Sequence, residues 1–303
     1  MSGDKQKFGF VAVIGEPNAG KSTLINKIVG TKVSIVSPKV QTTRTRVLGI
    51  AIYKNSQIVF VDTPGIFSAD QKNRMEKAIV ASAWEGVADA EVLLLLVDAT
   101  KKIGASTNII LERLKQETNK RCFLILNKID KIKREELLDL SLKLNEIHAF
   151  EATFMVSALK GNGVKDLLVH LSKMLPEEPW HYPEDQVTDM PMRLMAAEVT
   201  REKLFKMMHQ ELPYQLTVET ENWEEFDDGS IKIDQTIFIA REAHKKIILG
   251  KGGSMIKKIG QMAREELEDI LETRVHLKLF VKVRENWLDD EERYALWGLN
   301  PRA

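Results

Sequence analysis

The chain has 303 residues, which is enough for two ordinary domains with hydrophobic cores of their own. Basic and acidic residues balance at 44 each, so charge alone does not draw the whole chain to nucleic acid, and any such surface must be a local patch. A single cysteine, Cys122, excludes an intramolecular disulfide and a cysteine-based zinc cluster, and it suits a reducing compartment.

Two features of the sequence bear on membranes. The first residues, MSGDKQK, contain no apolar run typical of a signal peptide. The longest strongly apolar run, Val92–Val97, is far too short to span a bilayer. We therefore expect a cytoplasmic protein, and peripheral contact with a membrane surface remains open.

The first half of the chain alternates between short apolar runs and helix-like segments. This alternation predicts an α/β domain with a mostly parallel sheet covered by helices on both faces. One run, Val47–Asn55, directly precedes another and is expected to pair with it in an antiparallel hairpin through Lys54–Ser56. The six expected strands are FVAVI (10–14), VLGIAIYKN (47–55), IVFV (58–61), VLLLLV (92–97), CFLIL (122–126) and TFMV (153–156).

A proline-rich acidic stretch then interrupts the pattern and predicts a linker over 176–192, between the α/β domain (1–175) and a smaller α+β domain (193–285). In the second domain we expect a strand over 192–200 and a helix over 201–212. Two strands joined at Asp227–Gly229, a basic helical stretch and a last strand over 274–283 follow. Residues 286–303 form an acidic, tryptophan-containing tail.

The stretch GEPNAGKS (15–22) matches the phosphate-loop pattern, and it follows an expected strand and precedes an expected helix. Gly15 and Gly20 allow a tight turn that brings backbone N–H groups onto phosphate oxygens. Lys21 adds a cation for the β- and γ-phosphates, and Ser22 offers a hydroxyl to Mg²⁺. A plain glycine turn would not explain the lysine and the hydroxyl at this register.

Three further motifs end expected strands, at the edge of the sheet where ligands bind in such folds. In DTPG, Asp62 can hold Mg²⁺ through water and Gly65 can offer its N–H to the γ-phosphate, although DTPG alone is also compatible with a plain turn. In NKID, Asp130 can accept the two N–H donors of guanine, which adenine lacks, while Asn127 ties the loop to the base edge. In SAL (157–159), the Ala158 N–H can reach the guanine carbonyl.

The loop VQTTRTR (40–46) is polar and lacks regular periodicity. A threonine in it can bind Mg²⁺ and sense the γ-phosphate, and we expect Thr43 in this role with Thr42 as the alternative. A basic surface loop without such a role is the simpler interpretation of the same residues.

Taken together, GEPNAGKS, QTTRTR, DTPG and NKID resemble the TrmE–Era branch of translation GTPases. The resemblance implies hydrolysis of GTP to GDP and phosphate. Ile66 follows DTPG where small Ras-like switches have glutamine, so no side chain there orients the attacking water. In some members of the branch, an asparagine at the position of Asn18 binds potassium, which makes K⁺ a possible cofactor here.

The expected roles divide the nucleotide site into three overlapping sets. Lys21, Thr43 and Gly65 are expected to act directly in hydrolysis, and Ser22, Thr43 and Asp62 to hold the metal. The residues expected around GTP or GDP are Gly15, Glu16, Pro17, Asn18, Ala19, Gly20, Lys21, Ser22, Thr23, Asp62, Thr63, Pro64, Gly65, Asn127, Lys128, Asp130, Ser157, Ala158 and Leu159.

The second domain contains G-x-x-G at Gly250–Gly253 between two helix-like segments. Six basic residues and one acidic residue fall within Arg241–Lys258, so positive charge gathers where a phosphate backbone would run. A tight helix–helix turn is the alternative, but the order of elements resembles a type II KH module, which grips single-stranded RNA. The expected RNA-binding residues are Lys245, Lys246, Gly250, Lys251, Gly252, Gly253, Ser254, Lys257 and Lys258.

A G domain of this branch followed by a KH domain resembles the Era family along nearly the whole chain. The resemblance implies binding near the 3′ end of small-subunit (16S) ribosomal RNA, a role in maturing the 30S subunit, and partial association with the inner membrane. No DNA partner is expected, and no long apolar seam indicates an obligate dimer, so we expect a monomer. The alternatives are a GTP-dependent RNA-modification factor, a P-loop ATPase or kinase with an RNA module, and a binding protein without activity.

Overall fold

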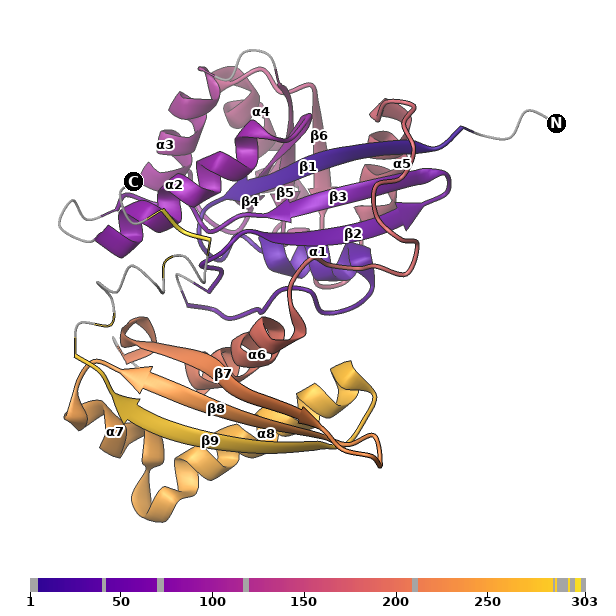
Figure 1. The fold of residues 1–303 in the computed structure, drawn as a ribbon. Coiled ribbons are helices and arrows are strands. Elements are labelled where there is room, and N and C mark those ends of the chain that lie inside the picture. The colour runs from indigo at the N-terminus through magenta and orange to yellow at the C-terminus, as the bar shows by residue number, and fades with distance from the viewer. Residues whose placement is uncertain are drawn as a thin grey trace. The chain divides into compact units, whose positions relative to one another are not determined.

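The computed structural model describes residues 5–39, 42–69, 74–116, 120–208, 212–285, 287, 294 and 298–300. These residues form two compact units, whose elements are labelled in Figure 1. The first unit takes its described residues from Met1–Ser34, Val40–Asp189 and Trp297–Ala303, and the second from Ile35–Lys39 and Met190–Leu296. Each unit is described by itself below.

The first unit is built on a six-stranded sheet in the order β2-β3-β1-β4-β5-β6. All neighbours pair in parallel except β2 and β3, which form the antiparallel hairpin expected from the sequence. The predicted mostly parallel six-stranded sheet is therefore confirmed. The strands are β1 Lys7–Gly15, β2 Val47–Tyr53, β3 Ser56–Asp62, β4 Val92–Asp98, β5 Arg121–Asn127 and β6 Ala152–Val156.

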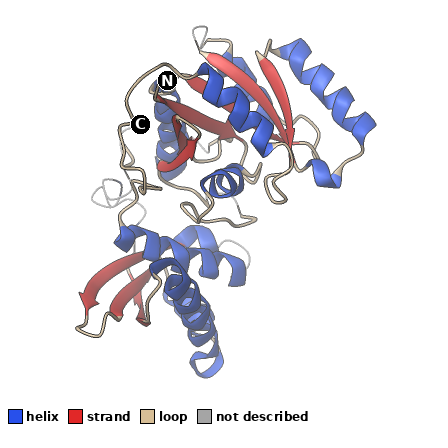
Figure 2. Cartoon of the chain, turned by 90° about the vertical axis from the view of Figure 1, so that its right-hand side faces the viewer, coloured by secondary structure: helices blue, strands red, loops and turns tan. Residues whose placement is uncertain are grey.

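Helices cover both faces of this sheet, as Figure 2 shows with helices in blue and strands in red. Alternate residues of β1 supply two separate cores: Ala12 and Ile14 pack with α2, α3 and α4, whereas Val11 and Val13 pack with α1 and α5. The helices are α1 Lys21–Val29, α2 Arg74–Ala88, α3 Ala105–Leu114, α4 Arg134–Ile147 and α5 Val164–Met174, with a 3₁₀ turn at Ile129–Lys131.

The residues expected to form a linker include a stretch that lies along the edge of the first unit. The Ile50 N–H donates to Val187 O at 2.9 Å, and the Leu48 N–H donates to the Asp189 carboxylate at 3.0 Å. These bonds satisfy the backbone of β2, which is the edge strand of the sheet. Residues 176–189 accordingly group with the first unit.

The second unit has a three-stranded sheet in the order β7-β8-β9, with β7 and β8 antiparallel and β8 and β9 parallel. Apolar side chains of α6 and α8, including Phe205 and Ile259, pack on Ile237 of the sheet. The two strands, two helices and final strand occur in the predicted order. The elements are α6 Met192–Met207, β7 Leu216–Glu225, β8 Ile231–Ile239, α7 Glu242–Leu249, α8 Ser254–Leu271 and β9 Val275–Val283, with 3₁₀ turns at Leu212–Gln215 and Lys251–Gly253.

The prediction of a strand over 192–200 is wrong, because α6 runs continuously from Met192 to Met207. The helix begins after Pro191, whose carbonyl accepts the N–H groups of Leu194 and Met195 at 2.9 and 3.0 Å. Proline is compatible with a helix start, since the first N–H groups of a helix have no partner within it.

The error arises from the burial of the first half of α6, where Met195, Ala196, Ala197, Val199 and Thr200 are nearly inaccessible. Arg201, Glu202 and Lys203 are all nearly inaccessible, and in the same unit the Val36 N–H donates to Glu202 Oε1 at 2.8 Å. Lys203 pairs with Glu266 of α8. Because every residue from Met195 to Phe205 except Glu198 is buried, the helix has no single apolar stripe of the kind that marks a surface helix.

The tail expected over 286–303 falls largely outside the described residues. Of those described, Trp287 is buried and its indole N–H donates to Gln215 O at 3.3 Å. Among the residues that the structure describes, no helix is long and apolar enough to cross a membrane.

Candidate nucleotide-binding and RNA-binding sites

The phosphate loop connects the end of β1 to the start of α1. Gly20 precedes the helix with a φ of 104°, and a Cβ there would lie 2.3 Å from Asn127 Nδ2, so only glycine fits. Lys21 is buried, and its ammonium donates to Gly15 O and Glu16 O, each at 3.1 Å. Burial lowers the pKa of Lys21 to about 8, against the opposing effect of the Asp62 and Glu16 charges.

The three predicted metal ligands converge beside this loop. Ser22 Oγ donates to Asp62 Oδ2 at 2.7 Å and lies 3.2 Å from Thr43 Oγ1. Asp62 is fully buried, and its other oxygen, Oδ1, has no hydrogen-bond partner. Burial raises the pKa of Asp62, although bonds from Ser34 and Ser22 and the charge of Lys21 act in the opposite direction.

This donor set fits Mg²⁺. Two hydroxyls and one carboxylate supply hard oxygen ligands, and Mg²⁺ in such sites completes its shell with water and phosphate. The buried, unpartnered Asp62 Oδ1 is the kind of group that a cation or its water shell would satisfy. No cluster of three or more His, Cys, Asp or Glu side chains occurs among the described residues to suggest another type of metal centre.

Gly65 lies directly against the phosphate loop. A Cβ at this position would come within 2.8 Å of Pro17, so the close approach requires glycine. The next residue, Ile66, donates its N–H to Gly15 O at 3.1 Å. The DTPG turn is thus fixed beside the loop that is expected to bind phosphates.

A pocket of ≈ 150 Å³ occupies the position expected for the base. The Asn127 side chain links two segments that line this pocket: its Nδ2 donates to Ala19 O at 2.8 Å, and its Oδ1 accepts the Ala158 N–H at 2.9 Å. The Ser157 hydroxyl donates to Asp130 at 2.6 Å, and this bond lowers the pKa of the Asp130 carboxyl. The lining residues are Gly20, Thr23, Asn127, Lys128, Asp130, Lys131, Ser157, Ala158 and Leu159.

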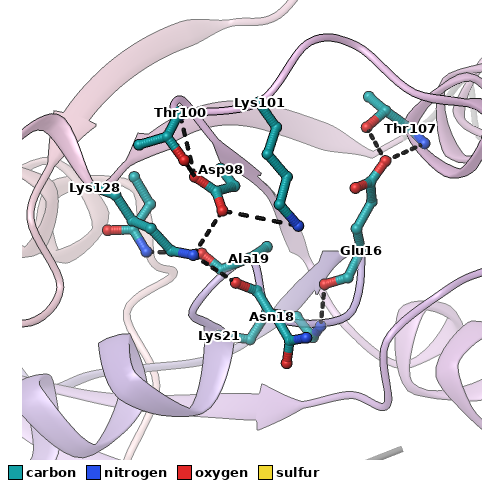
Figure 3. A network of polar contacts seen from close by, with 10 residues as sticks. Glu16, Asn18, Ala19, Lys21, Asp98, Thr100, Lys101, Thr107 and Lys128 are labelled. Carbon is teal, nitrogen blue, oxygen red and sulfur yellow. Dashed lines mark hydrogen bonds and ion pairs between the residues drawn. The ribbon is translucent and has the colours of Figure 1, made fainter. Parts of the chain in front are cut away.

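Lys128 joins the base pocket to the phosphate loop, as Figure 3 shows. Its ammonium donates to Asn18 O at 2.9 Å and to Asp98 Oδ2 at 2.6 Å. Burial tends to raise the pKa of Asp98, but bonds from Lys128 and Thr100 outweigh it and lower the pKa. Sequence reasoning missed Asp98, although it ends strand β4 at the same sheet edge as the other site residues.

Some residues of the predicted nucleotide set direct their side chains elsewhere. Glu16 reaches Thr107 at the start of α3 (Figure 3), and Thr63 donates its hydroxyl to Val13 O at 2.8 Å within the core. Leu159 is exposed at the mouth of the base pocket. For Glu16 and Thr63, a nucleotide contact would therefore have to come from the backbone.

The loop Gly250–Gly253 joins α7 to α8 in the second unit. Gly250, Gly252 and Gly253 all have positive φ, and a Cβ on Gly252 or Gly253 would meet no atom within 4 Å. The loop is therefore open to a ligand, and the N-terminus of the 18-residue helix α8 follows it.

Of the basic residues predicted to contact RNA, Lys246, Lys251, Lys257 and Lys258 are exposed, while Lys245 is half-buried and 3.8 Å from Glu242. Of the four exposed lysines, Lys251 thus lies within the glycine loop, Lys246 precedes it, and Lys257 and Lys258 follow it.

The apolar residues beside the loop differ in burial. Ile248 is fully buried in the core, whereas Ile247 is 55% exposed. Ile248 is thus an ordinary core residue, and Ile247 offers an apolar surface next to the basic loop.

Comparisons with known proteins match both units. A family model described as a 50S ribosome-binding GTPase matches residues 10–128, and one described as a KH domain matches residues 211–288. GTPase Era of Mesorhizobium japonicum is 59% identical over 291 residues, covering 96% of this chain and 93% of the relative. GTPase Era of Agrobacterium fabrum is 57% identical over 296 residues, covering 97% and 92%.

The chain belongs to the Era family of GTPases. Two solved Era structures agree with this assignment, each with a TM-score of 0.92, 39% identity and coverage of 97% of this chain and 99% of the other. One is Era in complex with MgGDPNP and nucleotides 1506–1542 of 16S ribosomal RNA, and the other is an Aquifex aeolicus Era variant bound to GDP·AlF4⁻. The first unit is accordingly an Era-type G domain, the second is a KH domain, and the protein is a GTPase.

Proposed function

We propose that this protein is a GTP-dependent switch that binds 16S ribosomal RNA near its 3′ end through its KH domain and acts in maturation of the small ribosomal subunit. The observation that carries the proposal is the joint placement of Ser22, Thr43 and Asp62 beside the phosphate loop, with Asp130 in a separate base pocket. The Era structure with MgGDPNP and 16S ribosomal RNA supports the choice of both ligands.

The residues expected around the phosphates have different roles in hydrolysis. Lys21 neutralises the β- and γ-phosphates, and the N-terminus of α1 adds backbone N–H donors. Ser22, Thr43 and Asp62 hold Mg²⁺, which supplies charge neutralisation between the phosphates when it is bound. Gly65 offers its N–H to the γ-phosphate, and its contact with Pro17 keeps that N–H close to the loop.

Selection of guanine rests on Asp130. Its carboxylate is ionised near neutral pH, and the Ser157 bond lowers its pKa further, so it accepts the N–H donors of guanine and faces adenine with an unpaired charge. Ser157 already fixes one oxygen of this carboxylate, which orients the group before a base arrives. The Ala158 N–H, held by Asn127, completes the polar wall of the pocket.

The switch works by ordering of the loops that carry Thr43 and Gly65 when GTP is bound, which changes how the G domain lies against the KH domain. Segment 35–39, which precedes the Thr43 loop, groups with the KH unit, and its Val36 N–H is bonded to Glu202 of α6. Coupling of this kind is reciprocal, so RNA should alter GTP affinity. Equal binding of a 16S 3′-end oligonucleotide by the GTP and GDP forms would overturn the switch.

Three further features belong to the same proposal. Asn18 binds K⁺ during hydrolysis, and equal GTPase rates in potassium and sodium buffers would count against this role. The protein works as a monomer in the cytoplasm, with peripheral contact to the inner face of the cell membrane. A role as a GTP-dependent RNA-modification factor would need a reactive cysteine, and Cys122 is buried in β5.

Exchange of one pocket residue tests the nucleotide assignment. Asp130→Asn places an amide where guanine offers N–H groups, so GTP affinity should fall by roughly 30-fold or more. Xanthosine triphosphate, which carries a carbonyl in place of the amino group, should bind the variant better than GTP. Lys143→Ala on the exposed side of α4 is the matched control and should leave both affinities unchanged. Wild-type protein that bound ATP as tightly as GTP would overturn the proposal.

A further inference from the structure

In helix α1, Ser22 and Asn26 lie four residues apart and therefore on one face. Ser22 belongs to the proposed metal site, but Asn26 has no place in the nucleotide motifs. Its side chain forms three hydrogen bonds with the segment after the helix: Oδ1 accepts the N–H groups of Val33 and Ser34 at 2.9 and 3.0 Å, and Nδ2 donates to Ser34 O at 2.7 Å. The backbone of Ser34 is thus held on both its N–H and its C=O.

The Ser34 side chain uses this fixed position to reach Asp62. Its Oγ donates to Asp62 Oδ2 at 2.6 Å, and the residue is only 2% exposed. A buried hydroxyl lowers stability unless it is hydrogen-bonded, so this bond is the reason a serine is tolerated here. Ser22 Oγ donates to the same oxygen at 2.7 Å.

Both donors therefore occupy one oxygen of the carboxylate and leave the other, Oδ1, buried and unpartnered. A carboxylate held by two donors on one side cannot rotate to satisfy its second oxygen without losing both bonds. This asymmetry keeps Oδ1 available in the fully buried site.

We propose that Ser34, held in place by Asn26, is a positioning residue that orients Asp62 so that Oδ1 faces the Mg²⁺ ion or its water. The inference rests on the proposed nucleotide function, because it assigns a role toward the Mg²⁺ of that site. Ser22 can give its lone pairs to the metal while it still donates its proton to Asp62. Ser34, in contrast, has no predicted contact with metal or nucleotide, so it acts through Asp62 alone.

The test measures release of a fluorescent GDP analogue from the full chain, in excess Mg²⁺ and in excess EDTA. In Mg²⁺, Ser34→Ala should release the analogue roughly tenfold faster than wild type, because the second donor to Asp62 is lost. In EDTA, the two proteins should release it at the same rate, since Asp62 then has no metal to hold. Ser34→Thr, which retains the hydroxyl, should restore the slow rate in Mg²⁺.

A matched control separates loss of this bond from loss of any buried serine hydroxyl. Ser56→Ala in β3 removes a fully buried hydroxyl that donates to Ser172 O at 3.3 Å, and it should leave both rates unchanged. If Ser34→Ala proves too unstable to purify, Asn26→Asp keeps the acceptor for the two N–H groups but loses the donor to Ser34 O. That variant should show a smaller acceleration of roughly threefold, again only in Mg²⁺.

The outcomes distinguish the inference from the function on which it rests. Release from Ser34→Ala at the wild-type rate in Mg²⁺, or an equal acceleration in Mg²⁺ and EDTA, would overturn the positioning role and leave the proposed function standing. A wild-type protein whose release rate did not respond to EDTA would overturn the proposed magnesium site itself.

Discussion

Glu16 of the phosphate loop is bonded to Thr107 at the start of helix α3, ninety-one residues further along the chain. Its Oε1 accepts the Thr107 N–H at 2.8 Å and the Thr107 hydroxyl at 2.5 Å (Figure 3). Helix α3 begins after Gly104, which has no side chain to cap it, so its first N–H groups need outside acceptors. Glu16 provides one, and its negative charge lies at the positive end of the helix.

This relationship predicts that Thr107→Val weakens the phosphate loop from a distance. The substitution keeps the shape of the side chain but removes the hydroxyl, and the free energy of unfolding should fall by about 1 kcal/mol. Because the loop loses one of its anchors, GDP affinity should fall severalfold as well. Chemical denaturation and titration with GDP measure the two effects.

Glu112→Gln serves as the control for Thr107→Val, since Glu112 lies on the same helix but pairs with Lys115 at an exposed site. Exposed pairs of this type contribute little, so stability and GDP affinity should both stay close to wild type. A Thr107→Val protein that matched Glu112→Gln in both measurements would contradict the anchoring role.

The sequence predicted those parts of the G domain that are specified by residues close together in the chain. The glycine spacing of Gly15 and Gly20 requires only a tight turn, and the apolar runs before Asp62 and Asn127 require only a buried strand. Since parallel strands end at one edge of the sheet, residues named from separate motifs were expected to meet there, and the structure brings Ser22, Thr43 and Asp62 within hydrogen-bond distances.

The residues that sequence reasoning missed depend on partners far along the chain. Thr107 matters because Glu16 reaches it, Ser34 because Asp62 lies beside it, and neither hydroxyl belongs to a spaced pattern. The first part of helix α6 was missed for a related reason: Thr200 is buried and donates its hydroxyl to Gln235 of β8 at 2.6 Å, and no nearby residue of the sequence indicates such a partner. Tertiary pairing of this kind is absent from a linear pattern.

The low pKa of Lys21 predicts a pH dependence of nucleotide binding. In the nucleotide-free protein burial lowers this pKa to about 8, and a bound polyphosphate favours the charged form and raises it. As pH rises through this pKa, Lys21 of the free protein loses its proton, and nucleotide binding must then take up a proton from solution. The affinity for nucleotide therefore falls as pH rises. Between about pH 7 and about pH 8.5 the protonated fraction, and with it GDP affinity, should fall about fourfold.

Lys21→Arg tests the origin of this dependence, because a guanidinium stays charged throughout the range. The variant should bind GDP more weakly than wild type, since the planar group does not fit the ammonium site, but its affinity should change little with pH. Fluorescence titrations at a series of pH values measure both slopes. Equal slopes in the two proteins would assign the pH dependence to another group.

Cys122 should be inert in the folded protein. It is 7% exposed in β5, and burial raises the pKa of its thiol to about 12, so very little thiolate exists near neutral pH. Thiol-reactive dyes should therefore label native protein far more slowly than protein unfolded in denaturant, with or without GDP. Rapid labelling of the native state would show that β5 opens locally on the time scale of the experiment.

The exposed lysines around the glycine loop predict an electrostatic share in RNA binding. Lys251 lies within the loop, next to Gly252, where an added Cβ would meet no atom within 4 Å and a phosphate backbone has room to approach. Replacing it with glutamine should lower affinity for a single-stranded 16S 3′-end oligonucleotide, and the slope of log affinity against log salt should become shallower by about 0.7, as expected for one lost phosphate contact. The effect should be similar for unrelated single-stranded sequences, because phosphate contacts carry no base information.

Lys278→Gln is the matched control for Lys251→Gln, since it removes the same charge from the same unit. Lys278 alternates on β9 with Leu277 and Leu279, which pack against the core, so its side chain lies on the opposite face of the sheet. Its loss should change neither the salt slope nor the affinity beyond a small long-range effect, which fades as salt screens the charge. If the two variants weakened RNA binding equally, the charge of the KH domain as a whole, and not the glycine loop, would account for the attraction.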